Sequence, residues 1–170
     1  MMVQEGEIAV DFSSATHHFR LDEQGVARPE GMKLVDFVVE DEHRIMLVEI
    51  KDPSDAGTTD KDRLAFARKL QTNLLVNADL TPKARDSYCY LHLMEQDKKP
   101  CLLVFLLGLE ALNAEPALLM GLRERLLQRL RHESDQPWVR HYVSDCVVVG
   151  LDGWNKAFPM YPAVRVAAGP

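Results

Sequence analysis

The sequence predicts an α/β fold in which a mixed central β-sheet is flanked by helices. Short runs rich in valine and isoleucine lie in the first third of the chain, and a helical period begins near Thr59. A fully apolar run, residues 101–107, then separates two helical regions. With 170 residues, 46% of them hydrophobic, the chain has the size of one globular domain, which we expect to span residues 1–162.

The N-terminal third predicts strands. Apolar residues alternate with small or polar ones over residues 8–12, and a second extended stretch follows, so residues 8–21 predict a hairpin or one long bent strand. Two apolar runs, residues 34–39 and 45–50, are separated by the polar segment 40–44. This arrangement predicts an antiparallel β-hairpin.

Two helices are expected next. Leu64, Ala67 and Leu70 fall on one face of a helix predicted over residues 59–75, and the charged residues fall elsewhere. Thr81 followed by proline predicts the N-cap and the first turn of a second helix, whose apolar side includes Tyr88 and Leu91.

The last third predicts a strand, a helix, a strand and a tail. The apolar run 101–107 is bounded by proline and glycine and predicts a buried central strand. Leucines at helical spacing predict a helix over residues 116–132, and residues 142–150 predict the last core strand. Residues 163–170 are small and are expected to form a flexible C-terminal tail.

Composition excludes several classes of protein. No apolar run approaches the eighteen residues of a membrane span, and residues 1–7 are acidic where a signal peptide would be basic. We therefore expect a cytoplasmic protein without a membrane partner. Cys89, Cys101 and Cys146 are far apart and indicate neither a disulfide framework nor a thiolate zinc site, so we expect them to be small buried hydrophobes.

The net charge of −6 hides an asymmetry. Residues 1–60 hold fourteen acidic and five basic residues, a balance of −9, whereas residues 61–170 hold twelve acidic and fifteen basic residues, a balance of +3. An acidic cluster beside a mildly basic remainder suits a cation site near a polyanion. It suits an ordinary solvated surface equally well.

Three charged residues form a candidate functional site: Asp36 on the first strand of the predicted hairpin, with Glu49 and Lys51 on the second. Glu49 and Lys51 are two apart, so both leave the same face of the strand. A turn centred between residues 42 and 43 pairs residue i with residue 85 − i, which sets Asp36 opposite Glu49. Two ionised carboxylates there would repel by about 3 kcal/mol at a separation of roughly 5 Å.

Three arrangements relieve this repulsion: a cation lies between the carboxylates, one carboxyl is protonated, or the register differs by one. In the first arrangement Asp36, Glu49 and the backbone carbonyl of Ile50 supply the hard oxygen ligands that Mg²⁺ or Mn²⁺ prefers. Lys51 would then position a metal-bound water or neutralise developing charge. The alternative is a pair of surface residues, Glu49 and Lys51, that form a weak exposed ion pair.

The spacing of Asp36 and Glu49-x-Lys51 on two hydrophobic strands, followed by a helix and a buried strand, resembles the PD-(D/E)XK nuclease superfamily over residues 5–110. The resemblance implies a restriction-endonuclease-like core, with Asp36 and Glu49 as metal ligands and Lys51 as the catalytic lysine. Glu7 or Glu5 would supply an additional upstream carboxylate. Val35 stands where the name of the family has proline, and the N-terminal segment is predicted to be a strand where the family usually begins with a helix.

Two groups of basic residues are candidates for binding nucleic acid. Lys83 and Arg85 lie near the start of the second helix and can approach a phosphate, although a structural role is the alternative. Arg125 and Arg129 share one face of the helix over residues 116–132, where a basic row can follow a nucleic-acid backbone. Such a row is also the usual solvated side of an amphipathic helix.

These observations predict a metal-dependent nuclease that hydrolyses phosphodiester bonds in nucleic acid, with DNA as the expected substrate and Mg²⁺ or Mn²⁺ as the cofactor. The alternative is a non-catalytic nucleic-acid-binding or protein-interaction module with a nuclease-like fold, which acts as a subunit of a defence or repair assembly. A protein partner or a homodimer is compatible with both hypotheses.

Overall fold

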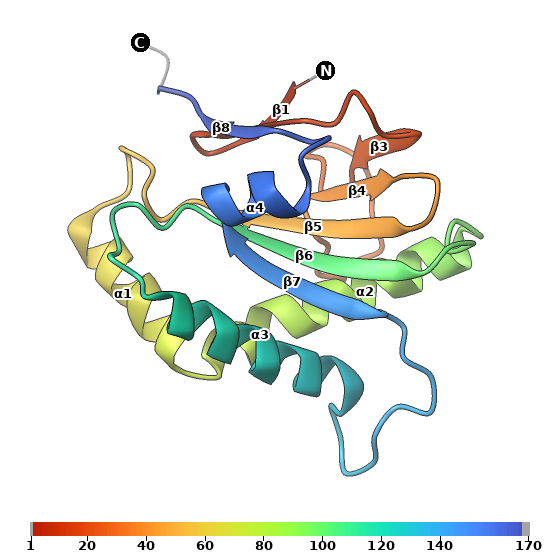
Figure 1. Ribbon diagram of the computed structural model, residues 1–170. Helices are drawn as coiled ribbons and strands as arrows, with labels where there is room; N and C mark the ends of the chain where they lie inside the picture. The colour runs from red at the N-terminus through yellow and green to blue at the C-terminus, as the bar shows by residue number, and fades with distance from the viewer. Residues whose placement is uncertain (1, 168–170) are drawn as a thin grey trace.

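The computed structural model describes residues 2–167, and its centre is a five-stranded mixed sheet (Figure 1). In spatial order the strands are β3 (His17–Arg20), β4 (Phe37–Glu40), β5 (Ile45–Lys51), β6 (Cys101–Leu107) and β7 (Asp145–Gly150). Strands β3, β4 and β5 pair antiparallel, whereas β5, β6 and β7 pair parallel. The predicted mixed sheet flanked by helices is confirmed.

A second sheet is formed by β1 (Met2–Glu5), β2 (Ile8–Asp11) and β8 (Ala163–Arg165), in the order β1-β2-β8. The hairpin or long bent strand expected over residues 8–21 is wrong, because β2 and β3 are separate strands: β2 pairs with β1 and β8, while β3 pairs with β4 in the other sheet. The tail expected over residues 163–170 is also wrong for 163–165, which form β8. Residues 168–170 lie outside the described residues.

Helices cover both faces of the central sheet. The structure assigns α1 (Asp60–Gln71), a π-helical turn η1 (Val76–Leu80), α2 (Thr81–Leu93), α3 (Pro116–Arg131) and α4 (Leu151–Ala157). Figure 1 shows α1, α2 and α3 on one face, and α4 with the small sheet on the other. No helix within residues 2–167 is long and apolar enough to cross a membrane.

The boundaries of the helices and strands differ from the predictions at several places. The first helix ends at Gln71, and after a break at Thr72 the chain resumes as a continuous helical segment through η1 into α2. Thr81 is therefore no N-cap: it is buried inside this segment, and its N–H donates to the carbonyl of Val76. The last core strand begins at Asp145 instead of residue 142, and α4, β1 and β8 were not predicted.

The alternation of side chains along the strands divides the core into two clusters. Val38, Leu47 and Phe105 belong to the cluster that includes buried residues of α1, α2 and α3. We call this side of the central sheet the helical face. Val39 and Met46 belong to the opposite cluster, which includes residues of α4, β2 and β8. All of β6 is buried, as predicted, and so are Cys101 and Cys146, whereas Cys89 is exposed, contrary to expectation.

An arginine links the C-terminal strand to the ends of β5 and β6. Arg165 of β8 donates to both oxygens of Asp52, at 2.9 Å each, and to Glu110 at 2.7 Å. Gly108 is the first residue after β6, and its Cα faces this pair of side chains. A Cβ added at Gly108 would lie 2.1 Å from Asp52 Oδ1 and 2.8 Å from Arg165 Nη2, so only glycine leaves the pair its space.

We expect Gly108→Ala to displace the pair of Asp52 and Arg165 and to lower the free energy of unfolding by about 1–3 kcal/mol. Urea denaturation of the purified protein measures this effect. The control is Gly121→Ala, because Gly121 lies inside α3 with no atom within 4 Å of an added Cβ, and this change should stabilise the helix by roughly 0.5–1 kcal/mol. Equal effects of the two substitutions would contradict the account of the pair.

Candidate functional site

Four charged residues converge at the carboxyl end of β5, beneath the start of α2. Asp36 directly precedes β4, and Glu49 and Lys51 are among the last three residues of β5. Lys83 lies in the first turn of α2. Asp36 is two residues from Val38, and Glu49 is two residues from Leu47, so both carboxylates occupy the helical face. Asp36 is 3% exposed and Glu49 is 0% exposed.

The register predicted for the hairpin is confirmed. Phe37 pairs with Val48 and Glu40 with Ile45, so each pair of residue numbers sums to 85. The side chain of Asp36 continues the ladder: its Oδ2 accepts a hydrogen bond from the N–H of Ile50 at 2.6 Å. In an extended strand the carbonyl of a residue leaves on the same side as its N–H, so the Ile50 carbonyl is directed towards Asp36, which precedes β4.

Glu49 is held by two lysines through one oxygen. Lys83 Nζ lies 2.6 Å and Lys51 Nζ 2.8 Å from Glu49 Oε1. The other oxygen, Oε2, is buried and accepts no hydrogen bond from any residue that the structure describes. The exposed ion pair considered from the sequence is therefore wrong in one respect, because Glu49 is an interior residue. Lys51 is one-third exposed and lies at the boundary with solvent.

Burial and like charge set the electrostatics of the two carboxyls. Burial, and then the charge of Glu49, raise the pKa of Asp36 to about 8, against a stabilising hydrogen bond from Ile50. Burial raises the pKa of Glu49, and the two lysines oppose it. Burial lowers the pKa of Lys51, but the charge and hydrogen bond of Glu49 outweigh burial and leave that pKa raised. Without a cation, Asp36 is thus predominantly protonated at pH 7.

The donor set of the site fits a hard divalent cation. Asp36 uses only Oδ2 in a hydrogen bond among the described residues, and Glu49 Oε2 has no partner. One oxygen of each carboxylate is therefore available, and neither lysine has to leave Glu49 to make them so. A buried carboxylate oxygen without a donor is costly, and a bound cation could supply the missing partner.

A second acidic group lies just beyond the same carboxyl end of β5, where Asp52 follows the strand, and it was not predicted as a site. Glu7, Asp52 and Asp55 each place one carboxylate oxygen within 4.8 Å of the others, a spacing that could hold a metal ion. Arg165 already donates to Asp52 and, at 3.3 Å, to Glu7, so its guanidinium neutralises part of this charge. Glu7 is therefore placed in this group, and Glu5 pairs with Arg20, instead of either joining Asp36 as the resemblance implied.

The structure gives the predicted nucleic-acid-binding residues different surroundings. Arg85 pairs with Glu133 at 2.6 Å and with Asp86 at 3.0 Å, so its charge is compensated. The guanidinium of Arg125 binds the C-terminal end of α1, where it donates hydrogen bonds to the carbonyls of residues 70 and 72. Arg129 lies four residues further along α3 and has no ion pair within the described residues.

The sequence did not reveal that Lys83 pairs with Glu49. The sequence left Lys83 with either a structural role or an approach to a phosphate, and the spacing of 34 residues along the chain carries no signal for its contact with Glu49. Ser87 of α2 is also buried, and its hydroxyl accepts a hydrogen bond from the N–H of Val35 at 2.9 Å, a contact that the sequence did not reveal either.

Comparison with protein-family models, with curated proteins and with solved structures finds no match to this chain.

In the absence of divalent cations, we expect the stability of the wild type to fall as the pH rises from about 4 to about 8. Over this range Asp36 holds its proton in the folded state and loses it in the unfolded state, so the unfolded state binds fewer protons. Asp36→Asn removes this dependence and should stabilise the protein at pH 8 by roughly 2 kcal/mol relative to the wild type.

Urea denaturation in EDTA at several pH values measures the difference. The control is Asp135→Asn, which removes an exposed carboxyl and should leave the pH profile of the wild type unchanged. Parallel profiles for the wild type and Asp36→Asn would show that Asp36 is ionised throughout.

Proposed function

We propose that the protein is a Mg²⁺- or Mn²⁺-dependent nuclease that hydrolyses phosphodiester bonds in nucleic acid, with DNA as the expected substrate. The observation that carries this proposal is the buried pair of Asp36 and Glu49, in which Glu49 Oε2 lacks a partner beside two lysines. The position supports it too, because ligands of open α/β sheets bind outside the carboxyl ends of parallel strands, where β5 ends.

The residues of the chain have distinct roles in this proposal. Asp36, Glu49 and the carbonyl of Ile50 hold the cation, which, when bound, polarises a phosphodiester and lowers the pKa of its water. The side chain of Lys51 is one-third exposed and lies on the same face, with Nζ 2.8 Å from Glu49 Oε1, where its ammonium group can stabilise charge that develops on the phosphate. Lys83 is a positioning residue, because it fixes the orientation of the Glu49 carboxylate.

One observation favours the alternative, a non-catalytic module with a nuclease-like fold. Two ammonium groups already compensate the charge of Glu49 without a cation, and ion clusters of this kind can serve structure alone. The net charge of −6 also opposes a polyanion unless a partner or a local basic surface compensates. The two hypotheses differ in metal binding and in turnover.

We expect Mg²⁺ or Mn²⁺ to raise the melting temperature of the wild type by about 3–6 °C at a concentration roughly tenfold above its dissociation constant. Asp36→Asn should abolish most of this shift, because it removes one anionic ligand and the repulsion that the cation relieves. Thermal denaturation with and without each cation measures the shift.

The matched control is Asp55→Asn, which removes a carboxylate from the second acidic group and should keep the shift of the wild type. A shift that Asp55→Asn abolishes and Asp36→Asn preserves would place the ion beside Glu7 and Asp52.

We expect Lys51→Ala to retain most Mn²⁺ binding and to lose nuclease activity by about two orders of magnitude. The ligands survive this substitution, since Lys83 still holds Glu49. The assay uses linear, nicked, branched and single-stranded DNA and RNA with Mg²⁺ and with Mn²⁺.

A double variant, Asp36→Ala with Glu49→Ala, is prepared in parallel and measures cleavage by contaminating nucleases. Equal cleavage by the wild type and the double variant on every substrate, together with salt-dependent binding of nucleic acid, would favour the non-catalytic module.

A further inference from the structure

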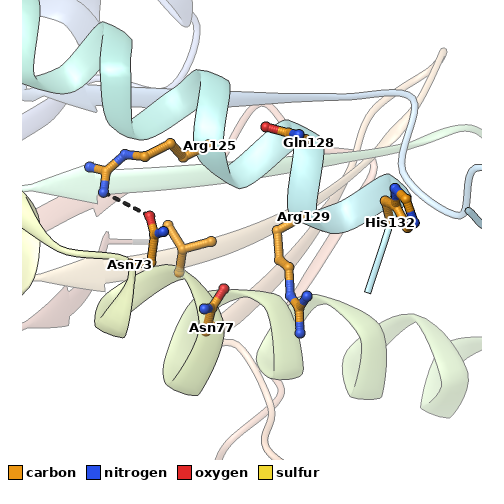
Figure 2. A pocket seen from close by; sticks show the side chains of 7 residues that line it. Asn73, Asn77, Arg125, Gln128, Arg129 and His132 are labelled. Atoms are coloured by element: carbon orange, nitrogen blue, oxygen red, sulfur yellow. Dashed lines mark hydrogen bonds between the residues drawn. The ribbon is translucent and has the colours of Figure 1, made fainter. Parts of the chain in front are cut away.

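A polar cavity of about 240 Å³ lies between the helical segment that contains η1 and the C-terminal half of α3. Apart from a valine, its lining is formed by three carboxamides, two guanidinium groups and an imidazole, which belong to Asn73, Asn77, Gln128, Arg125, Arg129 and His132. Figure 2 shows Arg125, Gln128, Arg129 and His132 along α3, with Asn73 and Asn77 on the facing segment. The cavity is separate from the pair of Asp36 and Glu49, neither of which lines it.

Arg125 forms the fixed end of this cavity. Its guanidinium donates to the carbonyls of Leu70 and Thr72, at 2.9 Å each, and to Asn73 Oδ1 at 3.1 Å. Because the oxygen of the Asn73 carboxamide accepts this bond, its NH₂ group remains free to donate (Figure 2). Arg125 therefore orders both the end of α1 and a hydrogen-bond donor of the cavity.

Arg129 is the cation without a partner. It extends from α3 towards the segment that carries Asn77 (Figure 2), and no carboxylate lines the cavity. Within the described residues its guanidinium has no ion pair or hydrogen bond, although Arg125 lies one turn away on the same face of α3. Like charges four residues apart in a helix are unfavourable unless an anion compensates them.

The remaining donors suit an acceptor that has several oxygens. Asn77 and Gln128 can each turn an NH₂ group to a ligand, since neither side chain has another partner in the part of the chain described, and His132 adds a ring N–H. A phosphate group accepts hydrogen bonds from several directions and takes a guanidinium in the bidentate manner. A divalent cation would find no anionic ligand here.

We propose that this cavity binds a phosphate group, with Arg129 as the main anion ligand and with Asn73, Asn77, Gln128 and His132 as hydrogen-bond donors. The inference goes beyond the proposed metal site and does not require nuclease activity. The group can belong to free phosphate or a mononucleotide, or to the backbone of a nucleic acid. The chemistry of recognition is the same for these sources, and the experiment distinguishes them.

Isothermal titration calorimetry in EDTA, at constant ionic strength set with NaCl, tests the inference with inorganic phosphate, adenosine monophosphate and a short single-stranded oligonucleotide. We expect saturable binding by the wild type and a loss of affinity of about tenfold or more in Arg129→Gln. Arg68→Gln is the matched control, because Arg68 is an exposed arginine of α1 outside the cavity, and it should bind as the wild type does.

Two further variants keep the test decisive. His132→Gln probes the same cavity independently if circular dichroism shows that Arg129→Gln is misfolded, and Asp36→Asn should bind phosphate normally because the metal site is separate. Tighter binding of the oligonucleotide than of phosphate, lost in the cavity variants, assigns the group to a nucleic-acid backbone. Binding of phosphate or the mononucleotide alone assigns it to a small ligand. No saturable binding of any probe, or equal binding by the wild type and both cavity variants, would overturn the proposal.

Discussion

Burying two carboxyl groups side by side beneath α2 is the constraint around which the rest of the site is organised. Asp36 and Glu49 share the helical face of the sheet, where water cannot solvate an ion, so each charge needs a partner from the protein or a bound cation. Asp36 uses the N–H of Ile50, and Glu49 uses Lys51 and Lys83. These contacts join the start of β4, the end of β5 and the first turn of α2, which are far apart in the sequence.

The described residues give these two carboxyl groups fewer partners than they can accept, and our proposal of a cation site rests on this shortage. Both lysines meet the same oxygen of Glu49, while Oε2 is enclosed without a donor. Burial and the neighbouring carboxylate raise the pKa of Asp36 to about 8, so a proton removes the charge of Asp36 at neutral pH. A cluster built only for stability would distribute its donors over both oxygens, since breaking or omitting one bond to a buried charge is expensive. The phosphate cavity is a separate polar feature whose cation, Arg129, likewise has no partner of its own.

The sequence predicted those features that depend on local pattern. The alternation of side chains and the turn between residues 42 and 43 specified the register of β4 and β5, and the apolar run 101–107 specified the buried β6. Features that depend on distant contacts were missed. Thr81 followed by proline has the local pattern of an N-cap, but packing extends the helical segment through it. The three residues 163–165 are too few to give a strand signal, and their pairing with β2 is accompanied by side-chain contacts of Asn155 with Ala163 and of Arg165 with Asp52. The contact of Lys83 with Glu49 likewise follows only from the placement of α2.

The most direct test of the central claim is a crystal structure of the protein with Mn²⁺, located by anomalous scattering. The account predicts an anomalous peak bonded to a carboxylate oxygen of both Asp36 and Glu49 at about 2.0–2.2 Å, with Glu49 contributing Oε2. A peak confined to the group of Glu7, Asp52 and Asp55, or both carboxylates of the proposed site without a peak at saturating Mn²⁺, would contradict it.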